Sequence, residues 1–323
     1  YPEAYKDAND MLKGGEESFD FLLEEAEECK PSEIRSAKEF EKEVWETFFG
    51  NEVGEPGLDY PLNFPGKIAT NYGTVVLVTG FKKHGKTAFL WQIAAKLAAD
   101  GKHGMIASFE IPSKDAVHYF VRSGLAGPPS NEKEYYDAMD RYGSRLMLYD
   151  KTGTKDWREL LEAMKFSYAK YGTWYFVIDS FMRLNIEPKS APVQEFMNAI
   201  TDFARETGTH VFLVAHARKP DTKNGGETRV PTSDMVRGAG ELSDNVWQQF
   251  AVWRNFGKED KRENGGTDTG WIDEPDAKIH LQFQRKYEGR TRLLNLNFSA
   301  EACQFYEIGT GPRRYFELGD EAT

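Results

Sequence analysis

One stretch of eight residues matches the complete phosphate-binding pattern G-x-x-x-x-G-K-[ST]: Gly80, Phe81, Lys82, Lys83, His84, Gly85, Lys86 and Thr87. In such a loop, successive backbone N–H groups and the N-terminus of the next helix point at one phosphate group. The Lys side chain reaches the β- and γ-phosphates, and the Thr hydroxyl completes the coordination of Mg²⁺. The pattern therefore predicts a site for a nucleoside triphosphate, with Ala88 as the first residue after the loop.

Three polar residues end apolar stretches further along the chain, namely Asp179, Glu110 and His216. A carboxylate in the position of Asp179 fits the group that holds the water shell of Mg²⁺. Glu110 fits the base that orients an attacking water. His216 could sense the γ-phosphate and bias the loop that follows it. Each also has an ordinary alternative: a turn or helix-capping Asp, an exposed Glu and a hydrogen-bonded surface His.

The spacing of apolar residues indicates which elements would bring these side chains together. Apolar runs predict strands at 75–79, 104–109, 146–149, 174–178 and 210–215, and helical periodicity alternates with them at 87–99, 113–122, 156–171 and 192–207. Such alternation builds βαβ units and a largely parallel sheet, with its ligands at the carboxyl ends of the strands. After residue 250 the pattern changes to β-hairpin material, at 250–254, 278–284, 292–298 and 304–308, with a polar loop over 257–270.

The acidic charge of the chain is concentrated near its N-terminus. The net charge is −11 over 323 residues, and residues 1–60 hold 6 Lys and Arg against 18 Asp and Glu, which leaves 35 against 34 elsewhere. Amphipathic helices are predicted there at 19–29 and 37–49, followed by a Gly- and Pro-rich linker over 50–66. No apolar run reaches the roughly 18 residues that a membrane span needs. Because the chain opens on Tyr1 rather than Met, we expect its natural N-terminus to lie further upstream.

A basic stretch rich in Gly, Pro, Thr and Asn follows His216, over residues 217–237. Its cations are Arg218, Lys219, Lys223, Arg229 and Arg237, against three acids. Flexible basic loops of this kind track the phosphate backbone of nucleic acids. A solvated surface loop is the plain alternative.

Together, these motifs resemble those of ring-forming replicative DNA helicases of the DnaB type. The segments that carry the resemblance keep the order and spacing of that family, at 80–87, 108–110, 177–180, 214–220 and 236–240. The likeness is closest to the helicase half of T7-type primase-helicases and of Twinkle-type helicases, and it covers residues 70–308. Residues 5–12 are more weakly similar to the last stretch of a primase domain. The acidic helices are similar to the linker helix that packs on a neighbouring subunit.

The resemblance implies an α/β fold: a RecA-like P-loop NTPase core with a mostly parallel sheet, C-terminal β-hairpins and an N-terminal helical linker. It divides the chain into an acidic helical linker (1–50), a connector (51–72), a helicase and ATPase domain (73–309) and a C-terminal tail (310–323). It also implies a homo-hexamer that hydrolyses ATP or another NTP or dNTP with Mg²⁺, translocates on single-stranded DNA and unwinds duplex.

The same resemblance implies partners and a location. A primase domain in the full-length chain and a replicative polymerase are expected partners, and no membrane is expected. The location would be the cytoplasm of a bacterium or of a phage-infected cell, with a mitochondrion or another organelle as the alternative.

Five residues take catalytic or phosphate-binding roles from the resemblance. Lys86 and Thr87 would bind phosphate and metal, and Asp179 would hold Mg²⁺. Glu110 would be the catalytic base, and His216 would sense the γ-phosphate.

The resemblance also assigns residues near the end of the domain. Arg254 and Phe298 match the pair that sandwiches the base, where the family often has Tyr in place of Phe. Arg285 matches the arginine finger that reaches the neighbouring subunit's nucleotide, although Phe283 stands where many members carry a second cation. The residues expected to hold DNA are Lys219, Lys223, Arg229, Arg237, Gly238 and Gly240.

Two other classes of protein share parts of this pattern. A RecA-like recombinase has the same core and binds DNA as a filament, without unwinding by translocation. A nucleotide-regulated assembly ATPase would have no nucleic acid partner.

Overall fold

The computed structural model describes residues 13, 36–49, 58–64, 73–151, 153–187, 189–218, 228–236, 239–264, 272–285 and 292–318. The chain divides into two compact units, residues 1–54 and 55–323. In the first unit, the 3₁₀ helix η1 (Ala37–Phe40) runs directly into helix α3 (Glu41–Phe49). This matches the helix predicted at 37–49. The helix predicted at 19–29 and the primase-like stretch at 5–12 lie outside the described residues.

Helix α3 carries its apolar residues along one side. Trp45, Phe48 and Phe49 are 55%, 74% and 70% exposed, and Val44 beside them is also exposed. The 3₁₀ helix η1 that leads into α3 begins after a capping box, in which Ser36 N–H donates to the Glu39 carboxylate at 2.9 Å.

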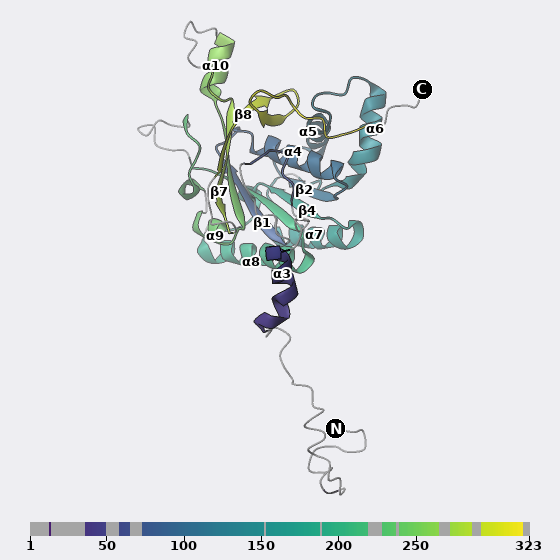
Figure 1. The fold of residues 1–323 in the computed structure, drawn as a ribbon, viewed down its shortest axis with the longest axis vertical. Coiled ribbons are helices and arrows are strands. Elements are labelled where there is room, and N and C mark those ends of the chain that lie inside the picture. Colours follow the sequence, from purple (N-terminus) through teal and green to yellow (C-terminus); the bar gives the residue numbers. More distant parts are fainter. Residues whose placement is uncertain are drawn as a thin grey trace. The chain divides into compact units, whose positions relative to one another are not determined.

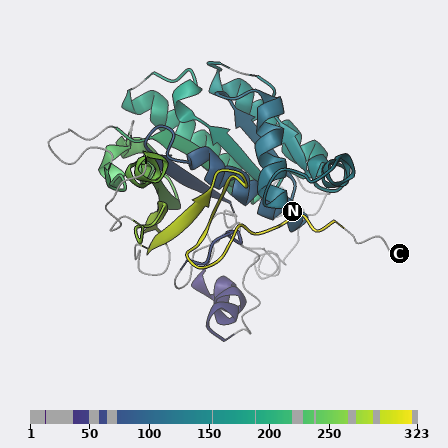
Figure 2. The same cartoon turned by 90° about the horizontal axis from the view of Figure 1, so that it is seen from above.

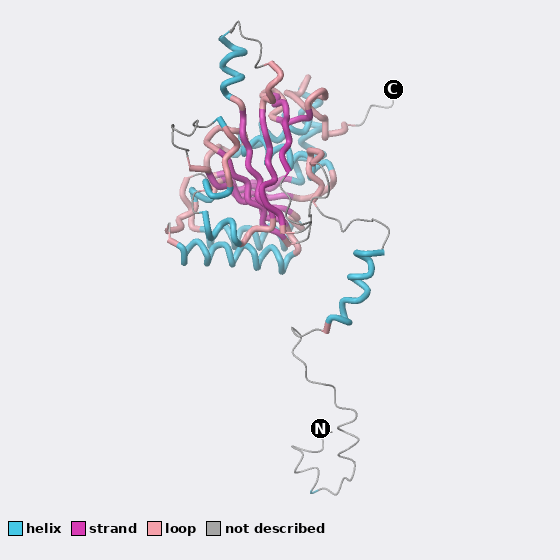
Figure 3. The backbone as a smooth tube through the Cα atoms, turned by 60° about the vertical axis from the view of Figure 1, so that its left-hand side comes forward, coloured by secondary structure: helices cyan, strands magenta, loops and turns pink. Residues whose placement is uncertain are grey.

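The described residues of the second unit form one sheet in the order β3-β2-β4-β5-β1-β6-β7-β8-β9, and Figure 3 shows it as a continuous layer. The strands are β1 (Thr74–Gly80), β2 (Gly104–Ser108), β3 (Leu146–Leu148), β4 (Tyr175–Asp179), β5 (His210–His216), β6 (Gln248–Arg254), β7 (Ala277–Gln284), β8 (Arg292–Ser299) and β9 (Gln304–Glu307). The pairings from β3 to β6 are parallel, and those from β6 to β9 are antiparallel. The predicted mostly parallel sheet with C-terminal hairpins is therefore confirmed. One detail differs, because β6, expected as hairpin material, also pairs in parallel with β1.

Helices cover both faces of the parallel part of the sheet, and α10 (Phe256–Asn264) projects beyond the strand ends (Figure 1). In chain order, the helices are α4 (Lys86–Ala99), α5 (Ser113–Leu125), α6 (Glu132–Tyr142), α7 (Trp157–Tyr171), α8 (Ser190–Thr207), α9 (Ala239–Asp244) and α10, with 3₁₀ turns η2 (Gly143–Arg145), η3 (Phe181–Arg183) and η6 (Ser233–Met235). Helices α4, α5 and α6 share one core with Val76 and Val78 of β1, and α7, α8 and α9 share the other with Val75 and Leu77. In Figures 1 and 2, α6 and β8 lie towards opposite ends of the sheet. None of the helices in the described part of the chain has the length and apolar character that crossing a bilayer requires.

Three helices of the described residues were not predicted: α6, the short α9 and α10. The polar loop expected over 257–270 is helix α10 as far as Asn264. Its polar residues hold it by ion pairs: Lys258 and Arg262 lie 2.9 and 2.7 Å from the carboxylate of Asp276, the residue directly before β7. Helix α6 is also strongly polar, and it begins where the side chain of Asn131 accepts a hydrogen bond from Glu134 N–H at 2.9 Å.

Residues 58–64 correct the linker prediction for that stretch. Leu58, Tyr60, Leu62 and Phe64 are buried in the α4 core. The Tyr60 hydroxyl donates to the side-chain oxygen of Gln248 at 2.6 Å. Gly and Pro marked this segment as a linker, yet its apolar residues pack into the core on one face of the sheet.

The expected C-terminal tail also packs against the domain. Tyr315 and Phe316 donate backbone N–H groups to the carbonyl of Gly124, at 2.8 and 2.9 Å. The ring of Phe316 stacks on Tyr142, with centroids 4.2 Å apart and planes 7° apart. The tail therefore packs against the C-terminal ends of both α5 and α6.

Candidate functional site

The phosphate-binding loop joins β1 to α4, in the context that its sequence predicts. Lys86, the first residue of α4, donates from Nζ to the carbonyls of Gly80 and Phe81 at 3.1 and 2.7 Å. Burial lowers the pKa of Lys86 to about 8. Gly80 is required here, because a Cβ at its φ of 155° would lie 2.4 Å from the carbonyl oxygen of Val252.

The two residues expected to hold Mg²⁺ lie side by side. The Thr87 hydroxyl donates to Oδ2 of Asp179 at 2.8 Å. Asp179 ends β4 and is buried, and its burial raises the pKa of the carboxyl group to about 6. A hydroxyl beside a buried carboxylate suits Mg²⁺, which takes few protein ligands and keeps most of its waters. No cluster of three or more His, Cys, Asp or Glu that could hold a metal occurs among the described residues.

Glu110 lies at the same edge of the sheet, because β2 pairs in parallel with β4. Its Oε1 is 3.5 Å from Nε2 of His216, the last residue of β5. It is also 3.4 Å from the Ser180 hydroxyl and 3.6 Å from Nε of Arg183. The sequence did not single out Ser180 or Arg183. The signal was their position directly after the strand that ends at Asp179.

These groups line one pocket with a volume of about 440 Å³. The predicted residues on its wall are Lys82, Lys83, Gly85, Lys86, Thr87, Ala88, Glu110, Asp179, His216, Arg254 and Phe298. The wall also contains residues that the sequence did not indicate: Trp91, Ile111, Tyr119, Arg122, Ala300 and Cys303. Burial raises the pKa of the Cys303 thiol to about 11, which keeps it neutral near pH 7.

The predicted base-binding pair forms the far wall of the pocket. The guanidinium of Arg254 at the end of β6 lies 4.1 Å from the ring centroid of Phe298 on β8. Arg254 also pairs with Glu259 of α10 at 2.6 Å. Arg254 and Phe298 therefore contact each other directly. A base between them would need roughly twice the distance of a single stacking contact, so one of the two side chains has to move.

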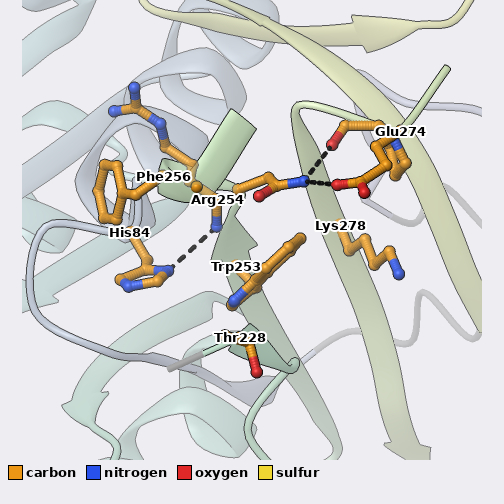
Figure 4. Close-up of a pocket in the computed structure, with 10 residues that line it drawn as sticks. His84, Thr228, Trp253, Arg254, Phe256, Glu274 and Lys278 are labelled. Atoms are coloured by element: carbon orange, nitrogen blue, oxygen red, sulfur yellow. Dashed lines mark hydrogen bonds between the residues drawn. The ribbon is translucent and has the colours of Figure 1, made fainter. Parts of the chain in front are cut away.

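The side chains of two loop residues, Phe81 and His84, were expected to contact the nucleotide but point in other directions. Phe81 is buried against Ala217 and Trp253, below the loop. The ring of His84 lines a second pocket of about 520 Å³ and accepts a hydrogen bond from Arg254 N–H at 3.1 Å (Figure 4). Figure 4 shows the Arg254 guanidinium pointing away from His84. Any contact of Phe81 and His84 with phosphate would therefore be through the backbone, as for Gly80.

Arg285 does not reach the pocket of its own chain. It follows β7, and its Nε donates to the carbonyl of Val246 at 2.9 Å. A second donor of the same guanidinium bonds the carbonyl of Asp244 at the end of α9.

The residues expected to hold DNA are described only in part. Arg229 is exposed, and so is Gly240 in the first turn of α9. The other four, Lys219, Lys223, Arg237 and Gly238, lie outside the described residues. The two ends of this segment meet below the phosphate loop, where Ala217 forms a bridge with Val236.

Known proteins share this architecture. The chain is similar to a solved structure described as an ATPase domain, with a TM-score of 0.65 and 14% identity over 85% of this chain and 100% of that one. It is also similar to a DnaB-like replicative helicase, described together with its interactions with primase, with a TM-score of 0.64 and 13% identity over 93% of this chain and 72% of that one. The AAA_25 family, described as an AAA domain, matches residues 67–222, which include the phosphate loop, Glu110, Asp179 and His216. The chain thus has the RecA-like α/β fold of the ATPase domains of DnaB-like replicative helicases.

Proposed function

We propose that this chain is an NTP-driven replicative DNA helicase that assembles as a hexamer, translocates on single-stranded DNA and unwinds duplex. The observation that carries the proposal is the convergence of Lys86, Thr87, Asp179 and Glu110 in one pocket at the carboxyl edge of the parallel sheet. That edge is where α/β folds bind their ligands.

The chemistry follows from the positions of these groups. Thr87 and Asp179 would hold Mg²⁺, which neutralises charge on the β- and γ-phosphates when bound. Nζ of Lys86 donates to the carbonyls of Gly80 and Phe81, and these bonds keep the ammonium group directed toward the phosphate-binding loop. Glu110 accepts a proton from the attacking water or orients it. His216 would respond to the γ-phosphate, and its Nε2, 3.5 Å from Oε1 of Glu110, supports this role.

Coupling to DNA is supported by backbone contacts below the phosphate loop. Ala217, which follows His216, donates its N–H to the carbonyl of Gly80 at 3.0 Å. The backbone N–H of Arg218 donates to the carbonyl of Met235, near the other end of the basic segment, at 2.6 Å. A change at the phosphate loop would therefore shift both ends of this segment, which would hold the phosphates of a single strand through Lys219, Lys223, Arg229, Arg237, Gly238 and Gly240.

The assembly is part of the same proposal. Arg285 bonds carbonyls of its own chain away from its own pocket, which fits a role at the nucleotide of a neighbouring subunit. A primase domain or partner and a cytoplasmic location follow from the same assignment. The similar DnaB-like helicase is described with primase, which supports a partner of that kind here.

Three measurements on one sample test the proposal: NTP hydrolysis with and without single-stranded DNA, unwinding of a forked duplex, and negative-stain imaging with nucleotide. We expect DNA-stimulated hydrolysis, unwinding and closed six-fold rings, all abolished in Lys86→Ala except ring formation. Helical filaments without unwinding would identify a recombinase instead. Hydrolysis that DNA does not stimulate, with no unwinding, would identify an assembly ATPase.

A further inference from the structure

One wall of the pocket contains Phe298, and helix α5, which is far from Phe298 in the sequence, holds this wall in position. Strand β8 ends one residue after Phe298, and the turn into β9 follows. Arg122 of α5 donates from Nε to the carbonyl of Glu301 and from Nη2 to the carbonyl of Ala300, both at 2.6 Å. One guanidinium thus binds two consecutive carbonyls of the turn.

This arrangement restricts the turn more than a single hydrogen bond could. The donors of a guanidinium have a rigid planar geometry, so two simultaneous bonds fix both distance and orientation. The neighbouring Ser123 adds a third contact, since its hydroxyl donates to the carbonyl of Cys303 at 3.2 Å. Within the turn itself, Ala302 N–H donates to the Ser299 hydroxyl at 3.1 Å.

The two walls that face the base are held differently. Phe298 is fixed by the turn and by its neighbour Phe305, whose ring centroid is 4.9 Å away. Among the described residues, the charged end of Arg254 contacts only side chains: Nε and Nη2 donate to Oε1 of Glu259 at 3.1 and 2.6 Å, and the guanidinium lies 5.2 Å from the ring of Phe256 as well as against Phe298. Since the two walls must separate to admit a base, Arg254 is the side that can move, and Phe298 is the side that stays in place.

We propose that Arg122 is a positioning residue that sets the affinity of the pocket for the base of the nucleotide, by holding the Phe298 wall. This inference rests on the proposed nucleotide site and deepens it. Helix α5 begins at Ser113, three residues after Glu110, and carries Arg122 near its other end. One rigid helix therefore connects the part of the pocket that acts on the γ-phosphate with the part that binds the base.

The experiment compares wild type with Arg122→Met and Arg122→Lys. Met keeps the unbranched stem and removes the donors, and Lys keeps the charge but not the two-pronged geometry. We expect the KM for ATP to rise about tenfold in Arg122→Met and by a similar factor in Arg122→Lys, because losing a charge-assisted contact has effects of that order. The kcat should change by less than a factor of about 2, since the phosphate end of the pocket is intact.

The decisive probe is inorganic tripolyphosphate, which has phosphates and no base. Its inhibition constant should be equal in wild type and both variants if Arg122 acts on the base wall. Equal weakening of tripolyphosphate and ATP would overturn the inference, because Arg122 would then contact the phosphates. An unchanged KM for ATP would overturn it as well.

Arg141→Met is the matched control. Arg141 of α6 also donates to a backbone carbonyl, that of Glu317, at 2.8 Å, and its guanidinium lies 5.5 Å from the ring of Tyr142. It should change the melting temperature without changing the KM. If Arg122→Met does not fold, Ser299→Ala disturbs the same turn more gently and should raise the KM about twofold to threefold, with the same tripolyphosphate result.

Failure of this inference can be told apart from failure of the proposed function. Nucleotide binding is measured without DNA, so the Arg122 effect on ATP against tripolyphosphate stands even if wild type does not unwind duplex. Conversely, wild type that unwinds duplex while Arg122→Met binds ATP normally would leave the helicase proposal intact and remove the role of Arg122.

Discussion

At the scale of single residues, the site holds two buried groups of opposite charge, Asp179 and Lys86, whose mutual attraction offsets only part of the cost of burial. Burial raises the pKa of Asp179 and lowers the pKa of Lys86, and both shifts favour the neutral form of the side chain. Strongly shifted groups in a cleft are typical of functional sites. A phosphate and Mg²⁺ would supply the missing charges, so the nucleotide-free protein should be less stable than a version without the buried carboxylate.

The substitution Asp179→Asn tests this point through its pH dependence. The folded-state pKa of Asp179, about 6, lies above its ordinary value of 3.8, so the native state holds its proton more tightly than the unfolded state. Stability must therefore fall as pH rises from about 4 to about 6 in wild type, and this part of the fall should vanish in Asp179→Asn. The two proteins should unfold alike below pH 4, and Asp179→Asn should be more stable by about 3 kcal/mol at pH 7.

Urea unfolding of nucleotide-free protein at pH 4, 5.5 and 7 measures the difference. Asp137→Asn, which neutralises an exposed carboxylate on α6, serves as the control and should track wild type. A constant gap between wild type and Asp179→Asn at all three pH values would show that burial of the charge is not the cause.

Glu110→Gln addresses the chemical step. Glutamine keeps the size and hydrogen-bonding capacity of the side chain but cannot accept the proton of water. We expect the rate of NTP hydrolysis to fall by about 10² or more while nucleotide affinity stays within a few-fold. Single-turnover hydrolysis and a binding titration measure the two quantities separately. Normal turnover in this variant would assign the base to another residue.

At the scale of elements, the sequence predicted what depends on local pattern. The phosphate loop is local, and strands β1, β2, β4 and β5 follow from short apolar runs. Because parallel strands end at one edge, the convergence of Asp179, Glu110 and His216 could be inferred before any contact was known. The strand boundaries agree with the predicted ones to within two residues.

Contacts between distant segments could not be predicted in this way. Helix α10 has a polar sequence, and it is held by Asp276 from another element. Residues 58–64 have the composition of a linker, but their apolar side chains are buried in the core on one face of the sheet. The bonds of Arg122 to the turn after β8 join residues about 180 positions apart, and nothing near Arg122 in the sequence marks them.

Docking of the C-terminal tail on α5 gives a prediction at this scale. A Cβ added at Gly124 would lie 2.0 Å from the ring of Phe316, so Gly124→Ala forces that ring to move. Overpacking of this kind costs about 1–3 kcal/mol. Alanine also gains about 1 kcal/mol of helix propensity over glycine, so a net loss of stability would come from the clash.

Gly311→Ala is the control in the same tail, since its Cβ would meet no atom within 4 Å. Denaturant unfolding measures both variants. If Gly124→Ala is as stable as wild type, the tail repacks freely and does not fix the end of α5.

At the scale of the whole molecule, the proposed function requires that one pocket be shared between two copies of the chain. Mixing Arg285→Ala with Lys86→Ala chains tests this directly. Each parent should be inactive, and mixed rings should recover part of the hydrolysis, because some interfaces then contain an intact Lys86 facing an intact Arg285. Hydrolysis is measured across mixing ratios after co-assembly has been verified. Activity that never exceeds the sum of the parents would place Arg285 outside the neighbour's site.

The proposed assembly also involves the N-terminal unit, whose helix is expected to pack on a neighbouring subunit. Helix α3 has nine residues, too few to be stable alone in water, and its Trp45, Phe48 and Phe49 are mostly exposed. Aromatic side chains of this size stabilise an interface chiefly when they are buried. Replacing Trp45 and Phe48 by Ser should therefore shift the hexamer toward smaller species at equal protein concentration, as measured by light scattering.

Lys42→Ser, a change to an exposed charge on the same helix, should leave the assembly unchanged. If the hexamer keeps its mass after loss of both aromatic side chains, the subunits are held together by the ATPase domains alone, and the apolar side of α3 serves a contact other than that between neighbouring subunits.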